Sequence, residues 1–148
     1  MNVHMASDPM DPEALETALR AIGHVRYHDL HPFHGLLHDG KLNKGQVQAW
    51  ALNRFVYQAA IPRKDASLIA RCEDRELRRE WLHRITDHDG VGEDQGGIDR
   101  GLILTDGLGL VRDYVIPQEG ALPAPTFALG PLGRFVRCYP LVGRLPRS

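Results

Sequence analysis

Histidine is concentrated in one short stretch of this sequence, where it could bind a metal ion or carry protons. Residues 24–40, HVRYHDLHPFHGLLHDG, contain five of the chain's eight histidines: His24, His28, His31, His34 and His38. On one continuous helix these five would lie within about 120° of one another. Pro32 interrupts such a helix, however, and no Cys-x-x-Cys or His-Glu-x-x-His spacing accompanies the run. Two short helix ends with solvated or capping histidines explain the pattern equally well.

Polar residues of unusually mixed type share one face of a helix expected in the middle of the chain. The segment NRFVYQAAIPRKDA, residues 53–66, would place five of them within an arc of about 120° if the helix continues past Pro62. They are Arg54, Tyr57, Gln58, Lys64 and Asp65. A solvated helix face with ordinary ion pairs is the alternative interpretation. Tyrosine and glutamine among cations and large apolar residues are nevertheless more typical of a lined cavity.

A later helix adds a proton carrier and a further cation. The motif RITDHDG places Arg84 and His88 four residues apart, with Asp87 on the same side. Arginine binds carboxylates through two parallel hydrogen bonds and lysine contributes a point charge, so a cavity with both favours a small, multiply anionic ligand. Histidine titrates near neutral pH, and His28 and His88 could therefore exchange protons with that ligand. Asp65 and Asp87 would orient the histidines or pair with the cations.

Helical patterns account for the segments that would position these side chains. A first amphipathic helix begins at residue 12, with Asp11 as its N-cap, and a short second helix occupies about residues 32–40. Asn43 and Gln46 have the spacing of a capping box, which predicts a long third helix as far as residue 61. Pro62 is expected to end or kink that helix.

The second half of the pattern is also helical. Asp74 precedes a fourth helix that closes at Gly90, and a weaker helix follows, with glycines at positions 101, 107 and 109. No run of alternating apolar and polar residues bounded by hairpin turns competes with these helices. The sequence therefore predicts an all-α fold.

Composition and charge exclude several classes of function. Eighteen Lys and Arg residues against nineteen Asp and Glu give a formal charge of −1, so net charge offers no basis for binding nucleic acid or a membrane surface. No apolar run approaches the roughly 18 residues of a membrane span, and the N-terminus lacks the apolar core of a signal peptide. Two widely separated cysteines, Cys72 and Cys138, fit a reducing cytoplasm.

The chain is expected to divide into three parts. Residues 1–11 contain HMAS, which is typical of an expression tag, and we expect them to be flexible. Residues 12–116 contain the helical patterns described above. Residues 117–148 hold six of the ten prolines, several glycines and arginines without acidic partners, which together predict an irregular tail.

Three segments together resemble the signature segments of the pyrroloquinoline quinone (PQQ) synthase family, in order and spacing: RYHDLHPFH, NRFVYQAAIPRKDA and DHDGVGEDQGGI. The resemblance covers about residues 14–128 and implies a haem-oxygenase-like helical bundle, of which residues 12–116 would form the N-terminal half. It also implies a location in the bacterial cytoplasm. The chain is similar to the beginning of methylotroph proteins that fuse this C component to the small peptide-carrier D component, which implies a functional link to the D component.

The resemblance further implies a reaction that uses neither a metal nor an organic cofactor. In the final step of PQQ biosynthesis, the family closes the third ring of a reduced, bicyclic, anionic tricarboxylate precursor and oxidises it to PQQ, with O₂ as co-substrate and hydrogen peroxide as by-product. Carried over by motif, the catalytic residues would be His88, His28, Arg84 and Lys64. The substrate would be bound by Tyr27, Arg54, Tyr57, Gln58, Lys64, Asp65 and Asp87.

The sequence departs from the family pattern at three positions. Val56 replaces a usual tyrosine, Gly101 replaces a usual tryptophan, and Leu132 lies near the place of a further active-site tyrosine. The C-terminal half of the bundle is missing from the sequence, so we expect a truncated chain with little or no activity. We expect its uncovered helices to pair in a homo-oligomer that exchanges helices between copies. Two other functions stay open: a non-catalytic, self-associating helical fragment, and a histidine-rich helical protein that binds a metal or haem.

Overall fold

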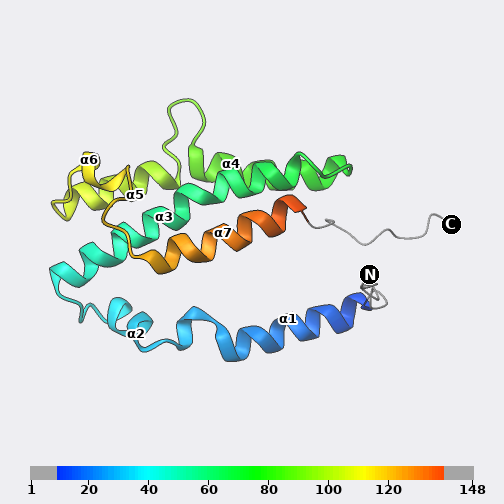
Figure 1. Ribbon diagram of the computed structural model, residues 1–148, viewed down its shortest axis with the longest axis horizontal. Helices are drawn as coiled ribbons and strands as arrows, with labels where there is room; N and C mark the ends of the chain where they lie inside the picture. Colours follow the sequence, from blue (N-terminus) through cyan, green and yellow to red (C-terminus); the bar gives the residue numbers. More distant parts are fainter. Residues whose placement is uncertain (1–9, 139–148) are drawn as a thin grey trace, which may run out of the picture. The chain divides into compact units, whose positions relative to one another are not determined.

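The computed structural model describes residues 10–138, which fold as helices joined by turns (Figure 1). These residues fall into two compact units, residues 10–42 and residues 43–138. Neither described unit contains a strand, and the one β-bridge, between Val91 and Asp94, is isolated. The all-α prediction is therefore confirmed. In the described part of the chain, no helix combines the length and the apolar character needed to cross a lipid bilayer.

The first unit consists of three short elements: α1 (Pro12–Arg26), the 3-10 turn η1 (His28–Leu30) and α2 (Pro32–His38). Asp11 caps α1 as predicted, because its side chain accepts a hydrogen bond from the Ala14 backbone amide. At the start of α2, Nδ1 of His31 accepts a hydrogen bond of 3.1 Å from the Phe33 backbone amide. One member of the histidine run is thus a helix cap, as the second interpretation of that run predicts.

The second unit is organised around α3 (Lys44–Ile69), a helix of 26 residues. The predicted capping box is present: the Asn43 side chain accepts from the Gln46 amide, and the Gln46 side chain accepts from the Asn43 amide. The helix continues through Pro62 and does not end there. Proline removes one hydrogen bond from a helix interior, and the burial of Pro62 shows that tertiary packing offsets this loss. The polar residues on both sides of Pro62 therefore belong to one helix.

Three further helices pack against α3 (Figure 1): α4 (Arg75–Asp89), α5 (Gly97–Gly107) and α7 (Pro123–Cys138). The predicted limits of α4 are confirmed, with Asp74 as its N-cap and Gly90 at its C-terminal end. A four-residue helix, α6 (Arg112–Val115), packs against α5. The core of the unit lies where α3, α5 and α6 meet, and consists of Leu52, Phe55, Leu102 and Val115.

The expected irregular tail is wrong for residues 123–138, which form α7. Pro123 and Pro125 occupy its first turn, where the backbone amides lack helical partners in any case. Only Pro131 lies in the interior of the helix, where proline is unfavourable by about 3 kcal/mol. The local sequence therefore disfavours a helix that nevertheless forms, and the reason is its contact with α3.

Hydrogen bonds near both of its ends hold α7 along α3. At one end, the Leu122 backbone amide donates to the Asn53 side chain at 2.8 Å, directly before α7 begins. At the other end, the Arg71 guanidinium donates to the Val136 carbonyl. Figure 1 shows α7 running beside α3 over most of its length. The rest of the predicted tail, residues 139–148, and residues 1–9 of the predicted tag lie outside the described residues.

Candidate active site

The polar face of α3 is divided between the helices that flank it. Arg54 and Gln58 line a cleft shared with α5, and Asp65 pairs with α4. Tyr57 and Lys64, at the other edge of the face, line a cavity shared with α7. The predicted arc is thus one helix face that contributes to two separate hollows.

Asp65 is the most deeply buried charged residue of the second unit, with an exposed fraction of 0%. Its Oδ2 accepts a hydrogen bond of 3.0 Å from Nε of Arg84. Nζ of Lys64 lies 3.1 Å from the other carboxylate oxygen, an ion pair without a hydrogen bond. A ligand cannot reach a fully buried carboxylate. What Asp65 can do is orient the two cations, which are themselves accessible.

Trp81 provides a surface against which both of these cations lie. The Arg84 guanidinium is 5.0 Å from the centre of the Trp81 ring, and the Lys64 ammonium is 6.0 Å from it. Both distances are within the range of a cation–π interaction. Arg84 and Lys64 are therefore held by a buried carboxylate on one side and an aromatic ring on the other, which restricts their side-chain freedom.

His88 lies near the C-terminal end of α4, one turn after Arg84. Its Nδ1 is 2.8 Å from the Arg84 backbone carbonyl. A carbonyl oxygen only accepts hydrogen bonds, so Nδ1 carries a hydrogen and Nε2 is the nitrogen that can gain or lose a proton. The ring is partly buried, whereas its neighbour Asp87 is exposed. The backbone of α4 thus fixes the tautomer that a general base would need.

The loop after α4 packs tightly against the backbone that carries His88. Gly90 has a φ of 81°, a left-handed conformation that favours glycine. At Gly96 the constraint is space: a Cβ there would lie 2.2 Å from the His88 carbonyl oxygen and 2.4 Å from the Gly90 nitrogen. The two glycines let the chain turn back directly beside His88 and begin α5.

The cleft between α3 and α5 has a volume of about 230 Å³, and its lining includes Arg54, Gln58, Arg100 and Gly101. Gly101 is the position at which the resemblance leads one to expect a tryptophan. A Cβ at Gly101 would lie 3.1 Å from Oε1 of Gln58. The glycine therefore leaves room for the Gln58 amide, which takes up space that a larger side chain would fill.

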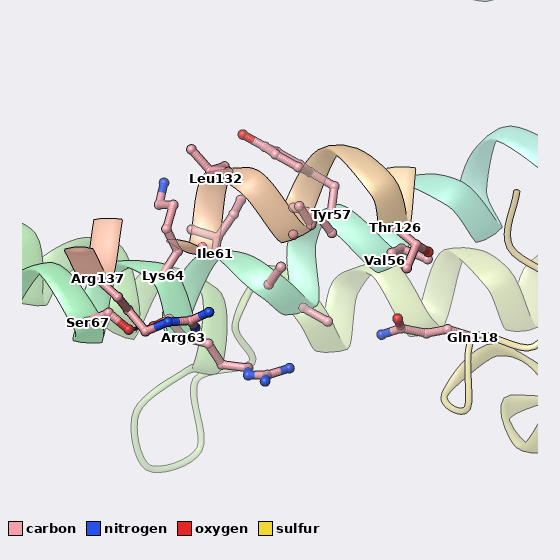
Figure 2. Close-up of a pocket in the computed structure, with 15 residues that line it drawn as sticks. Val56, Tyr57, Ile61, Arg63, Lys64, Ser67, Gln118, Thr126, Leu132 and Arg137 are labelled. Carbon is pink, nitrogen blue, oxygen red and sulfur yellow. Dashed lines mark hydrogen bonds between the residues drawn. The ribbon is translucent and has the colours of Figure 1, made fainter. Parts of the chain in front are cut away.

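The cavity between α3 and α7 is larger, about 330 Å³ (Figure 2). Apolar side chains, among them Val56, Ile61 and Leu132, form much of its wall. Its charged lining residues are all cations: Arg63, Lys64 and Arg137. Val56 and Leu132, two of the positions that depart from the resemblance, both lie here.

The two candidate residues of the first unit lie beside the histidine run. Tyr27 is 58% exposed, and its ring centre is 4.5 Å from that of His28. The His28 ring contacts His34 at 5.1 Å, and His34 contacts His38 at 4.2 Å. Among residues 10–138, no three His, Cys, Asp or Glu side chains are grouped to hold a metal ion. The roles of Tyr27 and His28 toward a substrate stay predictions.

Comparison with known proteins places this geometry in context. The model of the TENA/THI-4/PQQC family matches residues 16–142. The chain belongs to this family. A relative from Acidiphilium cryptum, named pyrroloquinoline-quinone synthase, is 62% identical over 128 residues, which are 86% of this chain and 52% of the relative. Synthases of the same name from Gluconobacter oxydans and Rhodopseudomonas palustris are 55% identical over 139 residues and 61% identical over 125 residues.

The chain spans about half the length of the curated relatives it matches: 94% of this chain aligns with 58% of the Gluconobacter protein, and 84% with 49% of the Rhodopseudomonas protein. The TENA/THI-4/PQQC match extends to residue 142 and so includes α7. The family match thus continues beyond residue 128, the limit suggested by the resemblance of the three segments.

Three residues of this TENA/THI-4/PQQC chain line the cleft or the cavity but were not predicted from the sequence. Arg63 precedes a predicted residue, Lys64, but lies outside the arc that the helical spacing selects. Arg100 lies in the cleft with Arg54 and Gln58, on a helix predicted only weakly. Arg137 was assigned to an irregular tail. A helical projection of residues 123–138 is the signal that could have found Arg137, because it places residues 126, 129, 130, 133 and 137 along one side.

Proposed function

We propose that this chain acts as a pyrroloquinoline-quinone synthase. The observation that most supports this function is the identity of 62% over 128 residues with a relative of that name. The arrangement of Lys64 and Arg84 around Asp65 is in keeping with it, since two accessible cations held in place suit an anionic substrate.

The reaction we propose is the oxidation of a reduced tricarboxylate precursor to PQQ by O₂. Each two-electron step transfers two electrons and two protons to one O₂ and releases one hydrogen peroxide, and the proposed reaction uses neither a metal nor an organic cofactor. The protein then has two tasks: it accepts protons from the precursor, and it stabilises negative charge that develops on the substrate and on oxygen.

His88 is the residue we assign to proton transfer. Its Nδ1 is occupied by the Arg84 carbonyl, which leaves Nε2 for the substrate. His28 assists it in this proposal. Arg84 and Lys64 stabilise the developing charge, with Asp65 as a positioning residue behind them. The remaining substrate contacts come from Tyr27, Arg54, Tyr57, Gln58 and Asp87.

The proposal includes partners. The precursor and O₂ are the substrates, and the peptide-carrier D component is a functional partner of the chain in the bacterial cytoplasm.

We also propose a homo-oligomer in which copies exchange helices. Four apolar side chains on α1 support self-association, with exposed fractions of 47–72%: Leu15, Leu19, Ile22 and Val25. The same observation favours a second candidate function, that of a non-catalytic, self-associating helical protein.

One assay separates the two functions. Purified chain, prepared without a nickel step, is mixed with the reduced precursor under air, while quinone absorbance and hydrogen peroxide are recorded. Synthase activity predicts quinone and peroxide in fixed proportion, and no quinone under nitrogen. If the precursor binds but yields no quinone above the rate of its spontaneous oxidation, the chain is not catalytic. Stoichiometric metal or haem in the same preparation would favour a metal-binding protein instead.

A further inference from the structure

The α3–α7 cavity has an uneven distribution of charge. Arg63 and Arg137 line the same cavity as Ser67, and Figure 2 shows the three labels together at one end of it. Tyr57, Val56 and Thr126 are drawn toward the other end. No acidic side chain is among the residues that line it. One end of this cavity is therefore basic, and its middle is apolar.

The two arginines at this end have no acidic partner in the described part of the chain. Lys64 has Asp65 as its ion-pair partner, but within residues 10–138 neither Arg63 nor Arg137 forms an ion pair or a side-chain hydrogen bond. The Ser67 hydroxyl donates to the Arg63 backbone carbonyl at 2.8 Å, and within the described residues it has no hydrogen bond to either guanidinium. Two guanidinium groups that line one cavity without an acidic side chain leave their hydrogen-bond donors for a ligand.

Arg137 points back along its own helix and not past its end. Its Nη1 and Nη2 atoms both lie 3.6 Å from the position that a Cβ would occupy at Gly133, one turn earlier. Helical side chains generally lean toward the N-terminus, and the missing side chain at Gly133 leaves the space for this one. The guanidinium is thus directed over the stretch of α7 that lines the cavity.

We propose that Arg63 and Arg137 form an anion-binding end of this cavity, which takes a small planar ligand with carboxylate groups. Guanidinium groups match carboxylate geometry through paired hydrogen bonds. The apolar wall of Val56, Ala60 and Ile61 contacts the body of the ligand, and the volume of about 330 Å³ is at the lower end of the range of about 300–1,000 Å³ for small-molecule sites. The identity of the natural ligand rests on the proposed function: the tricarboxylate precursor has the required chemistry, and two of its proposed contacts, Tyr57 and Lys64, line this cavity.

Calorimetric titration of the full chain with benzene-1,3,5-tricarboxylate at low salt tests this site without requiring turnover. The uncharged benzene-1,3,5-tricarboxamide, of similar size, is the control ligand. We expect the tricarboxylate to bind, the tricarboxamide to bind at least tenfold more weakly, and Arg63→Gln and Arg137→Gln each to raise the Kd of the tricarboxylate about tenfold.

Arg134→Gln is the matched control variant. Arg134 lies on α7, three residues before Arg137, but does not line the cavity, and its replacement changes the net charge by the same amount. Its Kd should stay within twofold of the parent value. Equal weakening by Arg134→Gln and Arg137→Gln would show a general charge effect and overturn the proposal, as would absence of binding to the parent chain. If circular dichroism shows that Arg137→Gln loses helix, Arg63→Gln decides the outcome alone.

The result is also separable from the proposed function. A chain that binds the tricarboxylate through both arginines but forms no quinone supports this site and contradicts the synthase activity. A chain that forms quinone while both variants keep the parent affinity supports the activity and overturns this site.

Discussion

At the residue scale, the contact that matters most for the proposed chemistry is the one between Nδ1 of His88 and the Arg84 carbonyl. This contact fixes the tautomer of the His88 imidazole through a backbone carbonyl, without a second side chain. Asparagine at this position could still donate to the carbonyl but has no group that titrates. We expect His88→Asn to lower the turnover number by about 10²- to 10⁴-fold, with little change in precursor affinity. Initial rates of quinone formation measure this, and a turnover number within twofold of the parent would remove His88 from the mechanism.

Asp65 allows a prediction about stability at the same scale. Because its carboxylate is fully buried and holds Arg84 and Lys64, Asp65→Asn removes the charge that both cations face. We expect the free energy of unfolding to fall by about 1–3 kcal/mol, measured by urea denaturation. Asp106→Asn is the control, since Asp106 pairs with Arg112 at the surface, where solvent screens an ion pair and leaves it little effect on stability. Equal effects of the two variants would contradict a special role for Asp65.

The Asp106–Arg112 pair leads to a third prediction, which concerns the pKa of Asp106. Hydrogen bonds of 2.7 and 3.0 Å from Arg112 hold the pKa of Asp106 below its ordinary value. A carboxylate whose pKa is lower in the folded state than in the unfolded state stabilises the folded protein at pH values above its unfolded-state pKa. This stabilisation is lost as the pH falls through the folded-state pKa. We expect Arg112→Gln to raise the pKa of Asp106 toward the ordinary value. Carbon-13 NMR titration of the carboxyl group measures it, and an unchanged pKa would contradict this assignment.

At the scale of elements, the first residues of α1, α3 and α4 could be predicted because their signals are local. Asp11, Asn43 and Asp74 cap the amides that follow them within three residues, and such contacts need no partner helix. The helix α7 could not be predicted in the same way. Pro131 and the glycines of α7 disfavour a helix locally, and the bonds that fix it link residues 69 and 65 positions apart.

The candidate site shows the same limit. Helical spacing alone places Arg54, Tyr57, Gln58, Lys64 and Asp65 on one face of α3, and the structure has them on one helix. Helical spacing could not predict how that face is divided between α5 on one side and α7 on the other. That division depends on which helices pack against α3. Arg137 and Arg100 can therefore be identified as lining residues only from the folded structure.

The loop between α4 and α5 is the element whose geometry tolerates substitution least. Gly96→Ala would place a Cβ 2.2 Å from the His88 carbonyl oxygen, a backbone atom that cannot move without disturbing the end of α4. We expect a loss of roughly 1–3 kcal/mol in unfolding free energy. Gly107→Ala is the matched control, because no atom lies within 4 Å of a Cβ there. Thermal melting of both variants compares them, and equal midpoints would contradict the close packing of this loop.

At the scale of the whole molecule, the two units differ in how much they bury. The unit around α3 has a core, formed by residues such as Phe55 and Val115. In the first unit, neither α1 nor α2 has a buried residue, although α1 is amphipathic. Exposing an aliphatic side chain rather than burying it costs about 1.5–3 kcal/mol. Burial of the apolar face of α1 against a second copy would therefore be favourable.

The last prediction follows from that face. We expect the chain to sediment as an oligomer in which α1 contacts another copy, and the double variant Leu19→Lys with Ile22→Lys to shift it to monomer, because each lysine would have to be desolvated in the contact. Thr17→Lys with His24→Lys adds the same charge on the opposite face of α1, about 180° away, and should leave the oligomer intact. Analytical ultracentrifugation of the three proteins decides the matter. A parent chain that sediments as a monomer would contradict self-association, and an oligomer that survives the Leu19 and Ile22 substitutions would place the contact on another element.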